Sequence, residues 1–202
     1  MPSDSAACDA RYRDELYPAG TEPAPIVREF LPLLPRGCAL DLAMGGGRNA
    51  VFLAACGWRV VGIDSSRAAL ENAEALAHER GVKVQWASPP SLELSAKLPG
   101  LLLLQADLER IALPPARFDL VLCIKYLQQS LFTAIERALR PGGALVYETY
   151  TVDQLAFPHG PRSPDHLLRS GELRSAFPGL KTLFYREFCA GRGIATLLAR
   201  KP

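Results

Sequence analysis

The chain has 202 residues, of which 49% are hydrophobic and 22% charged, and its formal net charge at pH 7 is +2. This length and composition predict one globular domain, and the mixture of acidic and basic residues, without a Lys/Arg-rich run, argues against a nucleic-acid or membrane surface. The first residues lack the basic-then-apolar pattern of a signal peptide, and no stretch approaches the roughly 18 apolar residues of a membrane span. We therefore expect a cytoplasmic protein.

The cysteines and histidines form no pattern typical of a metal site or a disulfide framework. The cysteines are odd in number and include no C-x-x-C pair, and the three histidines are far apart in the sequence. Three of the cysteines stand in apolar surroundings, where a small buried hydrophobic residue is the simpler interpretation. We predict neither a bound metal nor a disulfide framework. The cysteines are Cys8, Cys38, Cys56, Cys123 and Cys189.

An apolar run at residues 38–43 leads through glycines into a predicted helix at 49–56. Glycines at such a turn carry no Cβ atom, so backbone N–H groups can approach a ligand closely, and the following helix offers unpaired amides at its N-terminus. This arrangement predicts a site for a nucleotide-sized cofactor. The spacing Gly45-x-Gly47-x-x-Ala50 also satisfies the dinucleotide fingerprint, so the loop alone does not identify the cofactor.

A second predicted strand, at 59–63, leads to Asp64 and then to a long Ala/Glu/Leu-rich helix that two serines can cap. Two apolar runs, at 82–86 and 101–105, compete for the position of the third strand. We predict the second run as the strand because it leads directly into Asp107. The proline-bearing stretch between the two runs is then a surface excursion.

The second half of the chain continues the alternation of strands and helices. A continuous apolar run at 118–124 predicts a central strand covered on both faces. A helix at 130–139 ends at an Arg-Pro-Gly-Gly turn, before a strand at 144–149. Two strands at 180–188 and 194–199 are joined by a loop too short for a parallel crossover, so they must be antiparallel. The pattern predicts an α/β fold with a mostly parallel sheet that ends in a hairpin.

Several segments stand in an order that carries a family resemblance. They are Ala39-Leu40-Asp41-Leu42, Gly45-Gly46-Gly47-Arg48-Asn49, Asp64, Ala106-Asp107-Leu108, Phe118-Asp119-Leu120-Val121 and Arg140-Pro141-Gly142-Gly143. In this order, and with the closing hairpin, the chain resembles the class I S-adenosylmethionine-dependent methyltransferases. Within that family, the Gly-Arg-Asn-Ala continuation, the Tyr-Glu-Thr after the fifth strand and segment 160–164 resemble the tellurite-resistance-like small-molecule methyltransferases.

The resemblance implies a single Rossmann-like methyltransferase domain over residues 1–202. Its mostly parallel seven-stranded sheet would have helices on both faces and end in the antiparallel hairpin, with residues 1–36 as an N-terminal helical cap on a core at 37–202. It also implies S-adenosylmethionine as the cofactor and a small-molecule methyl acceptor as the partner. We expect no nucleic-acid or membrane partner, and a monomer or homodimer.

The resemblance also assigns the cofactor contacts. The strand acid, Asp41, orders the glycine loop and lies near the methionine moiety, whose ammonium group suits its charge, because a buried carboxylate needs such a partner. Asp64 is expected to accept the ribose hydroxyls, with a helix cap as the alternative role, and Asp107 to accept from adenine, with a plain loop acid as the alternative. For Arg48 we favour covering the loop or binding a carboxylate such as Asp41. The expected set is Asp41, Ala43, Gly45, Gly47, Arg48, Asn49, Asp64, Ser65, Asp107, Leu108 and Ile124.

The methyl acceptor is expected beyond the carboxyl ends of the fourth and fifth strands. Methyl transfer from a sulfonium is an in-line displacement that needs a base only if the acceptor must lose a proton, and Tyr126, Glu148 and His159 are the candidates. A surface-loop histidine is the alternative interpretation of His159. The proline-rich segment 157–164 predicts a lid over the acceptor, in which Arg162 either recognises an anionic acceptor or is an ordinary solvated side chain.

Other interpretations stay open at this point. We expect a thiol, a chalcogen oxyanion or a similar compound as acceptor, and we expect helices in 12–34 to close the other side of the pocket. A protein that binds S-adenosylmethionine without transferring its methyl group is one alternative. An NAD-binding oxidoreductase is another, which the glycine spacing favours and the closing hairpin disfavours.

Overall fold

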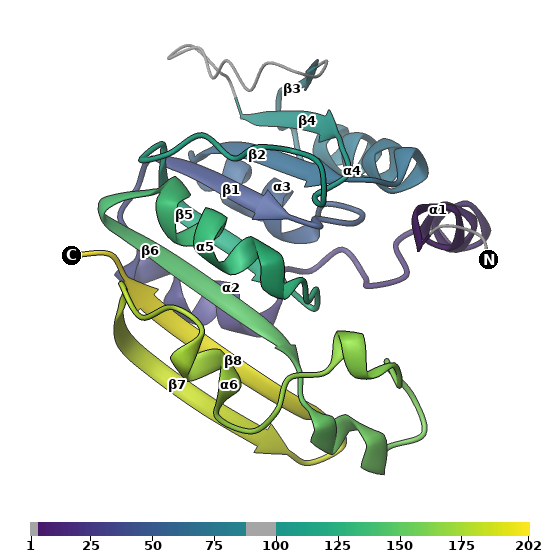
Figure 1. The fold of residues 1–202 in the computed structure, drawn as a ribbon. Coiled ribbons are helices and arrows are strands. Elements are labelled where there is room, and N and C mark those ends of the chain that lie inside the picture. Colours follow the sequence, from purple (N-terminus) through teal and green to yellow (C-terminus); the bar gives the residue numbers. More distant parts are fainter. Residues whose placement is uncertain (1–3, 88–99) are drawn as a thin grey trace. The chain divides into compact units, whose positions relative to one another are not determined.

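The computed structural model describes residues 4–87 and 100–202 (Figure 1). The chain divides into two compact units, 1–112 and 113–202, and each contains strands and helices of its own. The glycine loop and the three acids of the expected cofactor site belong to the first unit. The three candidates for acid–base chemistry belong to the second.

Four parallel strands form the sheet of the first unit, in the order β3-β4-β2-β1 (Figure 1). Strand β1 (Cys38–Leu42) pairs with β2 (Arg59–Asp64), and β2 pairs with β4 (Leu101–Gln105). All residues of β1 and all but the first of β2 are buried, as expected for strands that are covered on both faces. The ends of these three strands agree with the predicted ends to within a residue or two, so the three predictions are confirmed.

Both of the apolar runs that compete for the third strand are strands. The earlier run overlaps β3 (Val84–Ala87), which pairs in parallel with β4 at the edge of the sheet. The expectation of a single strand here was wrong because β3 is an edge strand, partly exposed along its length, and lacks the continuous apolar run of β4. The described residues therefore hold eight strands, where the resemblance implies seven. The predicted surface excursion at 88–99 lies outside the described residues.

The helices of the first unit follow the predicted order. Helix α3 (Arg48–Ala55) follows the glycine loop, and α4 (Arg67–Glu79) follows β2 with Ser66 as its N-cap, whose Oγ accepts from the Ala69 amide at 3.1 Å. Both helices pack against β2 and β4. Three helical segments precede β1 in the sequence, namely α1 (Asp4–Asp14), α2 (Pro25–Phe30) and the short 3₁₀ turn η1 (Leu31–Leu33). The N-terminal stretch is therefore helical in part, as expected.

The register of the parallel strands places three loops at one edge of the first unit's sheet. Leu42 of β1 pairs with Ile63, and Asp64 of β2 pairs with Gln105 of β4. The glycine loop, the start of α4 and Asp107 directly follow these positions. Ligands of open α/β sheets bind at this carboxyl edge, so the first unit has the expected place for a cofactor.

The second unit holds a mixed sheet in the order β5-β6-β8-β7. Strands β5 (Phe118–Ile124) and β6 (Leu139–Tyr150) are parallel, and β8 (Gly193–Arg200) pairs antiparallel with β6 and with β7 (Lys181–Cys189). The predicted closing hairpin is therefore confirmed (Figure 1). The helical segments are η2 (Gln129–Leu131), α5 (Phe132–Ala138), η3 (Val152–Ala156), η4 (Pro164–His166) and α6 (Glu172–Ser175).

Strand β6 begins before the Arg-Pro-Gly-Gly turn that was expected to precede it. Gly142, at φ +78°, donates its amide to the Lys201 carbonyl at 2.9 Å, and Lys201 donates its own amide to the Gly143 carbonyl. A Cβ atom on Gly143 would come within 3.0 Å of the Phe118 carbonyl. The end of the chain and the start of β5 thus hold this turn in extended pairing, which local sequence does not reveal.

The described residues hold no helix that is long and apolar enough to cross a membrane. Across 4–87 and 100–202 we find no cluster of three or more His, Cys, Asp or Glu side chains that is arranged to bind a metal ion.

Candidate functional site

The glycine loop of the first unit is a tight left-handed turn. Ala43, Gly45 and Gly47 have φ values of +51°, +55° and +78°. A Cβ atom on Gly47 would lie 2.5 Å from the Cβ of Ala73 on α4, so only glycine fits there. Ala43 adopts the same region at a strain cost of about 1 kcal/mol or more. The sequence therefore builds a strained turn directly ahead of α3, as is common where backbone must approach a ligand.

Asp41, in β1 just before this loop, is buried, with 1% of its surface exposed. The Ala50 amide donates to its carboxylate, but its Oδ2 atom has no hydrogen-bond partner among the described residues. Burial raises the pKa of Asp41 to about 7, the nearby charge of Asp64 adds to the rise, and the Arg48 guanidinium opposes it. A buried carboxylate oxygen without a partner is unfavourable, and an ammonium group would satisfy it.

Asp64 ties the glycine loop to the end of β2. Its Oδ2 accepts the Gly45 amide at 2.8 Å and its Oδ1 accepts the Ser66 amide at 2.9 Å. Burial raises the pKa of Asp64 above its usual value, and these bonds, with one from the Ser65 amide, oppose the rise. The residue is 8% exposed, and each carboxylate oxygen keeps acceptor capacity beyond these bonds. Asp64 thus shapes the turn, a role the sequence did not assign to it.

Arg48 and Asn49, at the start of α3, hold the N-terminal segment. Arg48 donates from Nη1 to the Ala19 carbonyl at 3.0 Å, and the buried Asn49 accepts the Ala24 amide at Oδ1 at 2.8 Å. The charge of Arg48 also lowers the pKa of Asp41. Both residues had been predicted as cofactor contacts, and these bonds give each a role in positioning the chain ahead of the sheet.

Asp107 and Leu108 follow β4 in a turn. The Oδ1 atom of Asp107 accepts the Glu109 amide at 2.9 Å. Its Oδ2 lies 3.5 Å from Nε of Arg110, in an ion pair whose side chains are 50% and 87% exposed and which therefore contributes little to stability. Leu108 is buried at 6% exposure. The Asp107 side chain is accessible at the carboxyl edge of the first unit's sheet.

The sequence did not identify Tyr12, which belongs to α1, as a site residue. Its hydroxyl oxygen contacts the position that a Cβ atom on Gly45 would occupy, and its ring lies 3.6 Å from the corresponding point on Gly46. The ring of Tyr17 lies 3.7 Å from the same point on Gly46. Because these contacts join residues far apart in the sequence, no local pattern could reveal them.

In the second unit, Tyr126 follows β5 and belongs to a chain of hydrogen bonds. Its hydroxyl donates to Oε1 of Gln128 at 2.7 Å, and Nε2 of Gln128 donates to the Ser130 hydroxyl at 3.0 Å. The buried Tyr147 hydroxyl donates to the Tyr126 carbonyl at 3.0 Å, and burial raises the pKa of Tyr147. Ile124, predicted as a cofactor contact, ends β5 and is 8% exposed.

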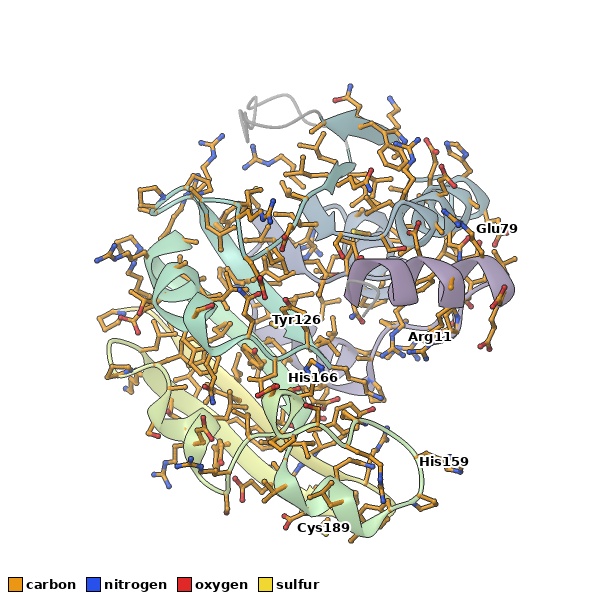
Figure 2. All side chains as sticks on the ribbon, turned by 45° about the vertical axis from the view of Figure 1, so that its right-hand side comes forward. Arg11, Glu79, Tyr126, His159, His166 and Cys189 are labelled. Carbon is orange, nitrogen blue, oxygen red and sulfur yellow. The ribbon has the colours of Figure 1, made fainter. Side chains whose placement is uncertain are left out.

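Glu148 and His159 have different surroundings. Glu148 lies in β6, where it pairs with Ile124 in register and its Oε2 accepts the Thr196 hydroxyl at 3.2 Å. His159 is exposed, and its imidazole belongs to the segment predicted as a lid (Figure 2). The buried Gln154 donates to the His159 carbonyl and accepts the Gly193 amide at 3.1 Å, and Arg162 donates to the Phe157 carbonyl at 2.9 Å. Gln154 thus fastens this segment to the β7–β8 turn.

The structure brings together, within the first unit, Asp41, the glycine loop, Asp64 and the start of α3. In the second unit the β5–β6 register places Glu148 beside the end of β5, which leads to Tyr126. The left-handed glycines at the carboxyl edge fit a cofactor that carries an ammonium group, as does the Oδ2 atom of Asp41, which has no partner within residues 4–87 and 100–202. These groups suit a nucleoside that carries an amino acid better than a pyrophosphate, because the carboxylates of Asp41 and Asp64 would repel phosphate.

Residues 40–147, more than half of the chain, match the methyltransferase-domain family. The ubiquinone biosynthesis O-methyltransferase of Bordetella pertussis is 26% identical over 156 residues, which are 68% of this chain and 58% of that protein. The chain therefore spans less than two thirds of the length of that relative.

Two solved structures share the fold at low identity. An S-adenosylmethionine-dependent methyltransferase from Mesorhizobium loti has a TM-score of 0.65 and 22% identity, covering 88% of this chain and 96% of that one. TehB from Haemophilus influenzae has a TM-score of 0.70 and 16% identity, covering 96% of this chain and 67% of that one. These likenesses establish the α/β Rossmann-like methyltransferase fold, mostly parallel with C-terminal antiparallel strands. The family match over more than half of the chain shows that it belongs to the class I S-adenosylmethionine-dependent methyltransferases, a family whose methyl donor is S-adenosylmethionine.

Proposed function

We propose that this protein transfers the methyl group of S-adenosylmethionine to a small-molecule acceptor, and that residues 1–202 act as one methyltransferase domain. The observation that carries the proposal is Asp41. Its carboxylate is buried, one of its oxygens has no partner among the described residues, and the left-handed glycine turn follows it directly in the sequence. The amino-acid end of S-adenosylmethionine carries an ammonium group that suits this oxygen. Family membership supplies the reaction, and Asp41 supplies the reason to expect that this chain retains the donor.

The other cofactor contacts follow from the same edge of the first unit. Gly45 and Gly47 let the loop backbone approach the ligand, since neither carries a Cβ atom. Asp64 is proposed to accept from the ribose hydroxyls with the lone pairs that its backbone bonds leave, and Asp107, which is accessible at the end of β4, to accept from the adenine amino group. The remaining proposed contacts are Ala43, Arg48, Asn49, Ser65 and Leu108 of the first unit, and Ile124 at the end of β5 in the second unit.

The transfer itself is an in-line displacement. The lone pair of the acceptor forms a bond to the methyl carbon while the carbon–sulfur bond breaks, its electrons remain on sulfur, and S-adenosylhomocysteine leaves. Positioning and exclusion of water supply much of the acceleration. A base is needed only for an acceptor that is still protonated, and we propose Glu148 ahead of Tyr126 for it, because the Tyr126 hydroxyl already donates its proton to Gln128. His159, exposed on its loop, is the weakest of the three candidates.

For the acceptor we propose a thiol, a chalcogen oxyanion or a similar small compound, in keeping with the motifs that resemble the tellurite-resistance-like group. An oxygen acceptor is the competing class, because the matched relatives are named ubiquinone biosynthesis O-methyltransferases. The two classes of acceptor differ in whether they need a general base from the protein. A thiolate or oxyanion attacks without a base, whereas a phenol must lose its proton and depends on Glu148 or Tyr126.

The test is a transfer assay with methyl-labelled S-adenosylmethionine against thiols, selenite and tellurite, phenols and amines. We expect labelled product from the first two groups, with a rate that Glu148→Gln leaves within about threefold. Product from phenols alone, with loss of the rate in Glu148→Gln, would replace our acceptor by an oxygen acceptor. Binding of the donor without any product would favour a non-catalytic binding protein, and binding of NAD instead would favour an oxidoreductase.

A further inference from the structure

Helix α1 is fixed to the first unit beside the glycine loop. Asp9 accepts the Ser66 hydroxyl at 2.6 Å and the Ala68 amide at 3.2 Å, and the bond from Ser66 lowers the pKa of Asp9. Nδ2 of Asn72 donates to the Tyr12 carbonyl at 3.2 Å. Figure 2 shows α1, marked by Arg11, alongside α4, which ends at Glu79. The helix is thus attached to the N-terminal part of α4, shortly after Asp64.

The segment that follows α1 is bound to the start of α3, the helix after the glycine loop. Arg48 holds the Ala19 carbonyl and Asn49 holds the Ala24 amide. Tyr17, between these anchors and α1, has a φ of +59°, a conformation that a tyrosine keeps only where its surroundings impose it. The segment from Asp9 to Ala24 is therefore anchored at the start of α3 and in the first turns of α4.

These anchors place the rings of Tyr12 and Tyr17 on the loop, and the Tyr12 hydroxyl reaches Gly45. The Tyr12 hydroxyl contacts the Cα side of Gly45, at the place where the missing Cβ atom leaves room, and its ring covers Gly46. Gly45 is also the residue whose amide is held by Asp64. The phenol therefore lies on the glycine turn that follows Asp41, the residue that the proposed function assigns to the ammonium group of the donor.

The chemistry of that end requires a hydrogen-bond donor at this turn. The ammonium and carboxylate groups of the donor share one carbon atom, so a carboxylate must lie next to the ammonium that Asp41 receives. Asp41 and Asp64 repel a carboxylate. A tyrosine hydroxyl can donate to it, and hydrogen bonds to charged groups are the stronger ones.

We infer that Tyr12 is a cofactor-binding residue whose hydroxyl donates to the carboxylate of S-adenosylmethionine, brought onto the glycine loop by the N-terminal segment. The inference rests on the proposed function and adds to it a contact from outside the strand–loop–helix motifs. The segment then has two roles, because it covers the loop and supplies one polar contact.

The test compares Tyr12→Phe with the unmodified chain by calorimetry, using S-adenosylhomocysteine and 5′-methylthioadenosine as probes. The second probe has the nucleoside and the sulfur but lacks the amino-acid end. We expect Tyr12→Phe to weaken S-adenosylhomocysteine binding by about tenfold or more and to leave 5′-methylthioadenosine binding within about twofold. Retained binding of the second probe also demonstrates that the variant is folded. Tyr185→Phe, on β7 in the second unit, is the matched control and should change neither affinity.

The outcomes separate this inference from the function on which it rests. If the unmodified chain binds neither probe, the proposed function fails and the inference with it. If the unmodified chain binds S-adenosylhomocysteine and Tyr12→Phe binds it equally well, the function stands and the role of Tyr12 is refuted. Equal weakening of both probes also refutes it, because such a loss reflects the ring or the fold and not a bond to the carboxylate.

Discussion

The substitution Asp41→Asn should stabilise the ligand-free protein at alkaline pH while weakening its binding of the cofactor. The side chain is buried, and one of its oxygens has no partner in the described part of the chain. Asparagine has nearly the same shape and can still accept the Ala50 amide. The substitution therefore removes a buried negative charge without opening a cavity.

The magnitude follows from the pKa. Burial raises the pKa of Asp41 from 3.8 to about 7, so ionising the carboxyl costs the folded chain about 4 kcal/mol more than the unfolded chain. Below pH 3.8 both states are protonated and there is no penalty, between 3.8 and 7 stability falls as pH rises, and above 7 the full penalty applies. The new buried N–H group of asparagine offsets part of the gain, leaving about 2 kcal/mol.

The assay is thermal unfolding of both proteins between about pH 4 and about pH 8.5, a range that spans the titration of Asp41. For a chain of this size, about 2 kcal/mol corresponds to a rise in Tm of roughly 4–8 °C near pH 8. Near pH 4 the charge penalty is almost absent while the cost of the buried N–H group remains, so Asp41→Asn should there be less stable than the unmodified chain by about 1–2 kcal/mol. Asp107→Asn, at a half-exposed carboxyl of the same unit, is the control and should not raise the Tm near pH 8, because it removes no buried charge. A difference in Tm that is independent of pH, or a variant that is less stable at alkaline pH, would refute the reasoning about the buried charge.

Three further substitutions test the packing. Gly47→Ala should destabilise the protein by about 3 kcal/mol, because alanine is strained at this left-handed position and its Cβ would clash with Ala73; a Tm within about 2 °C of the unmodified chain would contradict the geometry. Tyr17→Phe should be neutral or stabilising by up to about 1 kcal/mol, because the Tyr17 hydroxyl is buried without a partner among the described residues; a clear loss in urea unfolding would reveal a bond. Gln154→Leu should leave the Gly193 amide unpaired and speed limited proteolysis of segment 157–164, whereas unchanged cleavage would show that Gln154 does not fasten it.

The elements with continuous apolar runs could be predicted from the sequence. Strands β1 and β5 are buried along nearly their whole lengths, and each is apolar except for a single aspartate. The closing hairpin followed from loop length alone, because so few residues permit only an antiparallel return. Strand β3 could not be predicted in the same way, since it is an edge strand stabilised by pairing with β4 and exposes part of its side chains.

The acids and glycines of the candidate site could be located from the sequence, but their contacts could not. Asp64 was expected at the carboxyl edge, whereas its bond to the Gly45 amide joins two loops through tertiary structure. Arg48 was expected to cover the loop or to bind a carboxylate. It donates to the Ala19 carbonyl, a backbone group that the sequence does not distinguish from any other. Tyr12 reaches Gly45 because Asp9 and Asn72 fix α1 on α4, a set of tertiary contacts between distant parts of the sequence.

Binding of S-adenosylmethionine by the Asp41 loop is tested most directly by calorimetric titration of the chain and of Asp41→Asn with S-adenosylhomocysteine, with NAD as the comparison ligand. We predict that the unmodified chain binds S-adenosylhomocysteine and not NAD. We also predict that Asp41→Asn lowers the affinity by about tenfold or more, because the ammonium loses its charged partner. Binding of NAD alone, or unchanged affinity in Asp41→Asn, would contradict the assignment of this loop to the methyl donor.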